Sequence, residues 1–154
     1  MPSVDTQDYI AIIGIGCRFP GGVNSPDTFW RLLINGVDAI TDVPEERVAL
    51  WRSWPSFDPG GVPGFGGFIE EIDAFDAEFF GISPREARHM DPQQRLLLEI
   101  AWEAMEDAGL LPSEQAGSNT GVFAGIFLDE YWDLQRYVDA GMGIDAHTGV
   151  DISL

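Results

Sequence analysis

The sequence predicts an α/β domain, and three segments carry that prediction. The runs at residues 9–16 and 120–127 are rich in β-branched and small apolar residues and contain glycine, which is typical of buried strands. Between them, residues 92–108 follow an aspartate that can cap a helix and carry apolar residues on more than one stripe. That pattern predicts a helix that is buried on most of its sides and ends before Gly109.

Shorter elements are predicted around these three segments. Ser25-Pro26 has the signature of an N-cap followed by proline in the first turn, which predicts a helix ending near Asn35-Gly36. Residues 38–67 hold four prolines and little periodicity, which predicts a long surface segment. The other expected elements are at most a helical turn at 47–50, a short strand at 67–69, a short helix at 75–80, a helix with a capping box at Ser83-Pro84-Arg85-Glu86, and a helix that opens at 129–130.

Composition bounds the class of protein. At 154 residues, with 45% hydrophobic and 22% charged residues, the chain has the length and composition of one globular domain. It carries 26 acidic residues against 8 basic ones, all of them arginine, for a formal net charge of -18. An acidic surface repels phosphate backbones and anionic lipid, so we expect no nucleic-acid partner and no membrane partner.

The N-terminus and the cysteine count indicate a reducing compartment. Residues 1–8 are polar and acidic, unlike a secretory signal, and the apolar run at 10–15 is too short to span a bilayer. Cys17 is the single cysteine, which excludes an internal disulfide and a cysteine-based metal site. We therefore expect a cytoplasmic protein.

Each candidate for a chemical site has a structural interpretation that we favour. Cys17 would need a neighbouring base to act as a nucleophile, and it continues an apolar strand, so we expect a buried structural residue. His89 lies at a helix junction and His147 in a glycine-rich tail, so we expect a helix-end and a surface histidine. Gly14 and Gly16 lack the third glycine of a dinucleotide site, because Phe19 occupies that position. We expect them to pack closely against a neighbouring element instead of binding a phosphate.

Two further groups of side chains also have a structural interpretation that we favour. Trp51 and Trp54 flank Arg52 in the proline-rich segment, where we expect a loop anchored on the core and not a ligand platform. A run of carboxylates lacks the spacing of a calcium loop and predicts a solvated acidic face. Its members are Glu70, Glu71, Asp73, Asp76 and Glu78. From the residues alone we expect no metal site and no bound cofactor.

Several motifs resemble the modular polyketide ketosynthases, which are beta-ketoacyl synthases of the thiolase-like family. Residues 10–22 (Ile-Ala-Ile-Ile-Gly-Ile-Gly-Cys-Arg-Phe-Pro-Gly-Gly) resemble the opening of that family. Residues 75–87 and 90–99, which include Met-Asp-Pro-Gln-Gln-Arg-Leu-Leu-Leu-Glu, are similar to its next motifs. Residues 101–104 (Ala-Trp-Glu-Ala) and 120–125 (Thr-Gly-Val-Phe-Ala-Gly) continue the resemblance.

The resemblance implies a fold and a reaction. It implies the N-terminal half of a layered αβαβα fold, here truncated, with residues 1–8 as a polar extension and 9–154 as a partial ketosynthase domain. The family forms homodimers and carries out decarboxylative Claisen condensation of acyl thioesters that arrive on the phosphopantetheine of an acyl carrier protein. A cysteine takes the acyl chain because a thiolate attacks a thioester and later leaves again.

The same resemblance implies that this chain has no catalytic residue. The family's nucleophile lies in an Asp-Thr-Ala-Cys-Ser-Ser type motif, which does not occur in the 154 residues. Cys17 matches the cysteine of the opening strand, and neither His89 nor His147 matches a catalytic histidine. We expect the chain alone to be inactive. The alternative is a non-catalytic interaction module, or half of a split ketosynthase that pairs with a second chain.

Overall fold

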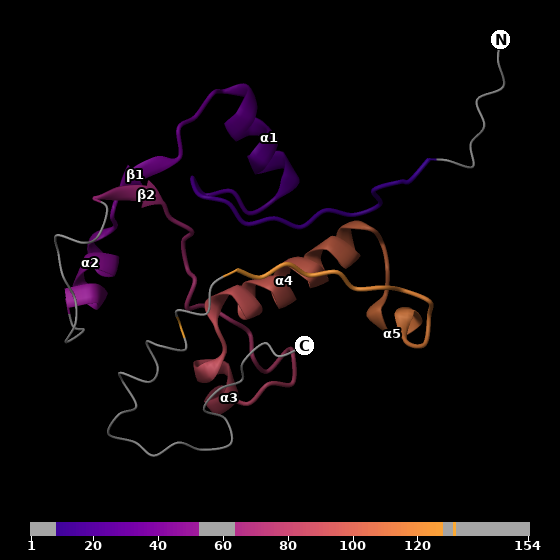
Figure 1. The fold of residues 1–154 in the computed structure, drawn as a ribbon. Coiled ribbons are helices and arrows are strands. Elements are labelled where there is room, and N and C mark those ends of the chain that lie inside the picture. The colour runs from indigo at the N-terminus through magenta and orange to yellow at the C-terminus, as the bar shows by residue number, and fades with distance from the viewer. Residues whose placement is uncertain (1–8, 53–63, 128–130, 132–154) are drawn as a thin grey trace, which may run out of the picture.

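The structure is a computed structural model that describes residues 9–52, 64–127 and 131 of the chain. Figure 1 shows short helices and a small sheet arranged around one longer helix, with an extended N-terminal segment passing alongside that helix. In chain order the elements are α1 (Pro26–Ile34), β1 (Ile40–Asp42), α2 (Glu45–Arg52), β2 (Phe65–Gly67), α3 (Pro84–His89), α4 (Pro92–Asp107) and α5 (Pro112–Gln115). None of the helices in the described ranges is long and apolar enough to cross a membrane.

Helix α1 begins and ends where the sequence predicts. The Ser25 side chain accepts a hydrogen bond from the Thr28 N–H, and the Thr28 hydroxyl oxygen accepts one from the Ser25 N–H at 3.0 Å. These two bonds satisfy N–H groups that the first helical turn leaves without a partner. The helix stops at Asn35, and Gly36 follows with a φ of 60°. Because only glycine adopts that left-handed conformation at low cost, the predicted stop is confirmed.

The proline-rich segment is more regular than the sequence predicts. α2 occupies eight residues where at most a helical turn was expected. The prolines of this segment flank the helix instead of interrupting it, and Glu45 and Glu46 complement the dipole of its first turn. β1 pairs with β2 in an antiparallel sheet in which Ile40 lies opposite Gly67. The strand expected at 67–69 therefore lies two residues earlier, and its partner was not foreseen.

Helices α3 and α4 follow each other with separate caps. Of the capping box expected for α3, the bond from the Glu86 N–H to the Ser83 hydroxyl forms at 3.2 Å. At the start of α4, Asp91 and Gln94 form the full reciprocal box, which confirms the predicted capping aspartate. α4 ends one residue before Ala108, and Gly109 has a φ of 68°. The expected bounds of this helix are confirmed.

The two predicted strands are not strands in the described structure. Residues 9–17 and 120–127 have no assigned strand, and no sheet partner for them occurs among the described residues. A strand exists only through hydrogen bonds to a neighbour, so an apolar pattern predicts the extended path but cannot supply the neighbour. The exposed fractions of Ile10 and Phe123 reach 96% and 98%. The strand prediction is therefore wrong for the described chain.

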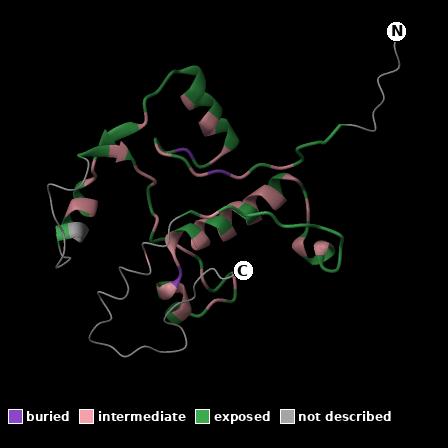
Figure 2. Cartoon of the chain, in the orientation of Figure 1, coloured by how far each residue is buried: buried purple, intermediate pink, exposed green. Residues whose placement is uncertain are grey.

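Burial is thin (Figure 2), and this corrects a second expectation. The hydrophobic side chains that are buried in the described ranges are Cys17, Val23 and Met90. No residue of α4 is buried, although most of its apolar residues are half-buried. The helix was expected to be covered on most of its sides. Extended residues 9–17 cover one side of it, and the described residues leave other sides open.

The expected helix at 75–80 is a series of turns. Its hydrogen bonds are irregular, with the Ala77 N–H on the Phe75 carbonyl and the Ile82 N–H on the Ala77 carbonyl. Aromatic rings fill the turns: Phe79 meets Trp102 of α4 edge-to-face, with ring centroids 4.6 Å apart. Phe79 therefore packs on α4 from a turn and not from a helix.

Candidate functional site

The site that the described residues build most firmly is the contact between segment 9–18 and α4. A Cβ atom added at Gly14 would lie 2.8 Å from the Ala108 Cβ, and one added at Gly16 would lie 3.2 Å from the Ala104 backbone nitrogen. Glycines two apart share one side of an extended segment, and residues four apart share one stripe of a helix. We call this contact the glycine seam. It consists of Gly14, Gly16, Ile100, Ala104 and Ala108.

Polar contacts fix the register of the glycine seam. The Ile15 N–H donates to the Asp107 carboxylate at 2.9 Å. The Arg18 guanidinium donates twice to the Glu103 carboxylate, with Nη1 lying 2.6 Å from Oε2 and Nη2 on Oε1. Bidentate guanidinium–carboxylate contact is geometrically specific because both groups are planar. The segment therefore runs antiparallel to α4, and polar contacts hold it at Ile15, within the seam, and at Arg18, just after it.

Arg18 is also the cation of the neighbouring loop. Its Nη1 donates to the carbonyl oxygens of Cys17 at 3.1 Å and Asn24 at 3.3 Å. The hydrogen bond to Glu103 raises the pKa of Arg18, partial burial opposes that change, and the charges of Glu103 and Glu99 add to the increase. The hydrogen bonds of the guanidinium therefore hold the loop on α4.

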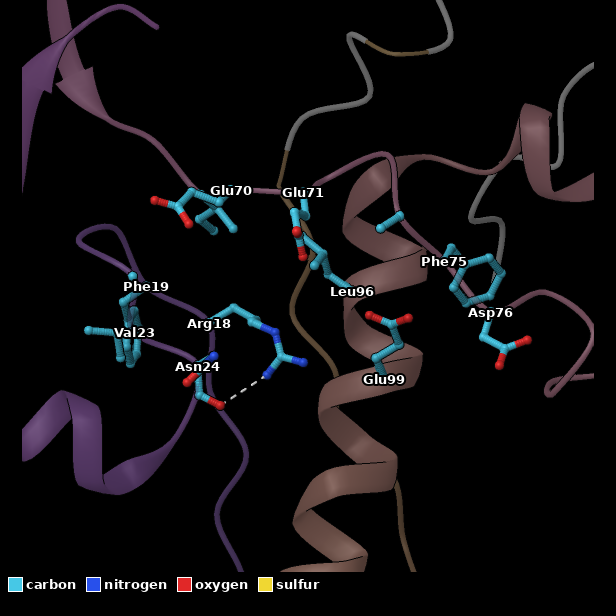
Figure 3. Close-up of a pocket in the computed structure, with 13 residues that line it drawn as sticks. Arg18, Phe19, Val23, Asn24, Glu70, Glu71, Phe75, Asp76, Leu96 and Glu99 are labelled. Atoms are coloured by element: carbon cyan, nitrogen blue, oxygen red, sulfur yellow. Dashed lines mark hydrogen bonds between the residues drawn. The ribbon is translucent and has the colours of Figure 1, made fainter.

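A cavity of about 340 Å³ lies beside Arg18 (Figure 3). Arg18 lines it from the N-terminal loop, Glu99 from α4, and Glu70 and Glu71 from the segment after β2. The described lining contains no cysteine, serine, threonine or histidine. The described lining of this cavity therefore offers an acyl thioester neither a thiol nor a side-chain hydroxyl.

The candidates named from the sequence do not meet in one site. Cys17 is buried, with 7% of its surface exposed, as expected for a structural residue. His89 lies in the last turn of α3, where its Nδ1 is 2.8 Å from the Arg85 carbonyl oxygen, so the expected helix-end position is confirmed. His147 and Trp54, together with the Trp51 side chain and the helix expected from 129–130, lie outside the described residues.

The acidic run and the two glycines behave as expected. All five carboxylates of the run, Glu70, Glu71, Asp73, Asp76 and Glu78, are exposed. Within the described ranges, no three histidine, cysteine or acidic side chains are grouped so that they could hold a metal ion. Gly14 and Gly16 pack closely on α4, which confirms the packing role expected for them. Sequence reasoning missed Arg18, whose partner Glu103 is 85 residues away.

Comparison with known proteins identifies the class of domain. Residues 7–152 match the family described as beta-ketoacyl synthase, N-terminal domain. The oxazolomycin ketosynthase domain OzmH KS7 of Streptomyces albus matches 92% of this chain and is 34% identical, with a TM-score of 0.71. A ketosynthase from module 6 of the bacillaene synthase of Bacillus subtilis matches 64% of it and is 37% identical, with a TM-score of 0.53. The α/β fold class, as the N-terminal part of a thiolase-like ketosynthase fold, is confirmed.

The chain belongs to the beta-ketoacyl synthase family and corresponds to its N-terminal domain. Its relatives are polyketide synthases. It is 48% identical over 151 residues to a phenolphthiocerol/phthiocerol polyketide synthase of Mycobacterium tuberculosis, covering 93% of this chain. It is 57% identical over 125 residues, 81% of this chain, to the spectinabilin polyketide synthase system protein NorA' of Streptomyces orinoci. The chain spans 8% and 3% of the lengths of these two relatives and 24% of the solved oxazolomycin ketosynthase chain.

Proposed function

We propose that these residues form the N-terminal scaffold of a polyketide-synthase ketosynthase, which as a whole condenses acyl thioesters with loss of carbon dioxide. The observation that carries the proposal is the family match over residues 7–152, together with relatives that are polyketide synthases. In this role the chain holds α4 and the opening segment in register through the glycine seam and Arg18. We assign residues 1–8 to a polar extension and 9–154 to part of the ketosynthase domain.

The chemistry of acyl transfer gives this chain no catalytic role in our proposal. Condensation needs a thiolate that reaches an acyl thioester and a base or positive environment that lowers the pKa of its thiol. Cys17 is the single cysteine of the sequence, it is buried, and the glycine seam lies directly before it. The nucleophile and the histidines of the reaction then come from other parts of a ketosynthase.

The partners follow from the proposed reaction. Substrates arrive on the phosphopantetheine of an acyl carrier protein, and the complete ketosynthase is a homodimer in the cytoplasm. The chain has a net charge of -18, so an acidic carrier protein would meet a surface of its own sign. Like charges across an interface lower affinity and the association rate, and we therefore expect no carrier docking through this region. Strong carrier binding that weakens as salt rises would contradict this part of the proposal.

An acylation assay tests the catalytic assignment. The purified 154-residue chain is incubated with an acyl thioester, and intact mass reports whether a covalent adduct forms. We expect no adduct on the parent chain or on a Cys17→Ala variant. A stoichiometric adduct that disappears in Cys17→Ala would make Cys17 a nucleophile and overturn the assignment.

A second candidate function is a half of a split ketosynthase, in which a companion chain would cover the exposed apolar segments. Ile10, Val122 and Phe123 are almost fully exposed, with exposed fractions of 96%, 89% and 98%. Such side chains need a covering partner. If this candidate is right, a companion polypeptide that begins near the active-site cysteine motif should produce condensing activity when it is mixed with this chain. Failure of the mixture to acquire activity, with both chains folded, would dismiss it.

A further inference from the structure

A second cavity, of about 380 Å³, lies between the start of α2 and the start of α4, away from the glycine seam. Arg47 of α2 and Arg95 in the first turns of α4 both line it, although they are 48 positions apart in the sequence. Tyr131 contributes a further wall, and Ile72 and Pro92 contribute apolar surface. Two of the eight basic residues of a strongly acidic chain therefore converge on one cavity.

Arg95 has a donor without an acceptor. Its Nε is buried and has no hydrogen-bond partner among the residues that the structure describes. A buried N–H that makes no hydrogen bond has lost its hydration without compensation, which costs more when the group is charged. Arg95 lines the cavity, so an acceptor oxygen that reached this N–H from the cavity, with a small adjustment of the side chain, would remove that cost. Arg95 therefore favours an oxygen-rich ligand over an apolar one.

Arg47 is held in place at the same cavity. Its Nη2 donates to the Ile69 carbonyl oxygen at 3.0 Å, which uses one of the five N–H groups of the guanidinium. A guanidinium that is anchored by one bond loses less conformational freedom when it binds a ligand with the others. The Tyr131 hydroxyl donates to the Arg88 carbonyl oxygen at 2.9 Å, which fixes that wall as well.

The carboxylates that line the cavity do not neutralise the two arginines. Glu46 and Asp73 are exposed, whereas Arg47 and Arg95 are half-buried. In the described part of the chain, neither arginine is ion-paired with either carboxylate. The two arginines are therefore less exposed to solvent than the two carboxylates. Negative charge elsewhere on the molecule is screened within about 8 Å at physiological ionic strength.

We propose that this cavity binds a phosphate group, which Arg47 and Arg95 hold through their guanidinium N–H groups. A phosphate supplies several acceptor oxygens and enough negative charge for two guanidinium groups, and the planar fork of arginine matches its geometry. The apolar surface of Ile72 and Pro92 leaves room for the organic part of a phosphate ester. The ligand class is therefore a small organic phosphate.

Binding to the full 154-residue chain tests the proposal. Titration calorimetry would compare inorganic phosphate, phenyl phosphate and acetate at fixed ionic strength. We expect saturable binding of both phosphates, tighter for phenyl phosphate, and weaker binding of acetate. Inorganic phosphate that binds as tightly as phenyl phosphate would overturn the ester assignment. Absence of saturable phosphate binding would overturn the site itself.

Matched variants separate a specific site from general charge. Arg47→Gln and Arg95→Gln each remove a charge-assisted contact and should weaken phosphate binding about tenfold or more. Arg52→Gln makes the same charge change at an exposed position of α2 that does not line the cavity, and should leave affinity unchanged. Equal weakening in all three variants would refute the site.

One variant is expected to bind phosphate more tightly, a result that misfolding would not produce. Asp73→Asn removes a carboxylate from the rim of the cavity and should tighten phosphate binding. Arg95→Lys keeps the charge but loses the planar fork, so it should bind more weakly than the parent. Far-UV circular dichroism of each variant checks that helix content is retained. Asp73→Asn with unchanged or weaker binding would count against the placement of the phosphate.

Discussion

Replacing Gly14 with alanine tests the glycine seam at its tightest point. The new Cβ would lie 2.8 Å from the Ala108 Cβ and 2.9 Å from the Ala108 nitrogen, and closer still to the Ala104 carbonyl oxygen. Carbon atoms pack best at about 3.5–4.0 Å, so the segment would have to move away from α4. Two of the three nearest atoms belong to the helix backbone, which cannot give way as the end of a flexible side chain can.

The magnitude follows from two opposing effects. Forcing an extra methyl group into a packed contact costs about 1–3 kcal/mol. Alanine also restricts the unfolded chain relative to glycine, which stabilises by about 0.4–1 kcal/mol where the backbone is compatible. Gly125 supplies the matched control, because it lies in an extended segment and a Cβ there meets nothing within 4 Å. Gly14→Ala should therefore be less stable than Gly125→Ala by about 1–3 kcal/mol.

Urea unfolding measures this difference. Far-UV circular dichroism would follow the loss of helix in the parent and both variants. All three proteins would be measured at the same micromolar concentration, so that association affects them equally. With a denaturant slope of about 2 kcal/mol per molar, the midpoint of Gly14→Ala should fall below that of Gly125→Ala by roughly 0.5–1.5 M. Coincident midpoints for the two variants would refute the close contact at Gly14.

Three further predictions concern charge and exposed apolar surface. Arg18→Met and Glu103→Gln should show a coupling free energy of about 1 kcal/mol in a double-mutant cycle. The coupling should be smaller in high salt, because both side chains are partly exposed. A coupling that salt does not change would contradict the ion pair. Because the pKa of Arg18 is raised in the folded chain, the part of the stability that depends on its charge should be lost as the pH rises through that pKa, in strongly alkaline solution. The chain alone should be marginally folded or associate, since burying each exposed Ile or Phe of the two extended segments is worth about 1.5–3 kcal/mol. Sedimentation velocity that shows only a monomer, together with a sharp, reversible unfolding transition by circular dichroism, would argue against this.

Local signals predicted the helices better than the strands. The caps at Ser25 and Asp91 and the glycines at 36 and 109 define α1 and α4 to within a residue, because these groups act on their immediate neighbours. α2 was underestimated because the prolines around it were counted as part of an irregular segment. The helix expected at 75–80 is a series of turns in which Phe79 contacts Trp102, and local propensity does not encode a contact between such distant parts of the chain.

The sequence by itself determined the positions of the caps, the close packing of Gly14 and Gly16, the burial of Cys17 and the resemblance to a ketosynthase. Each depends on residues that are close in the chain or on motifs read directly. Only the tertiary structure decided that segment 9–18 runs antiparallel to α4, that Arg18 pairs with Glu103, and that Arg47 and Arg95 share a cavity. Contacts between residues tens of positions apart depend on how the elements pack, and no local spacing encodes them. For the same reason, residues 9–17 and 120–127 have the composition of strands but remain unpaired in the described structure, because a sheet needs a neighbouring strand that an apolar pattern cannot provide.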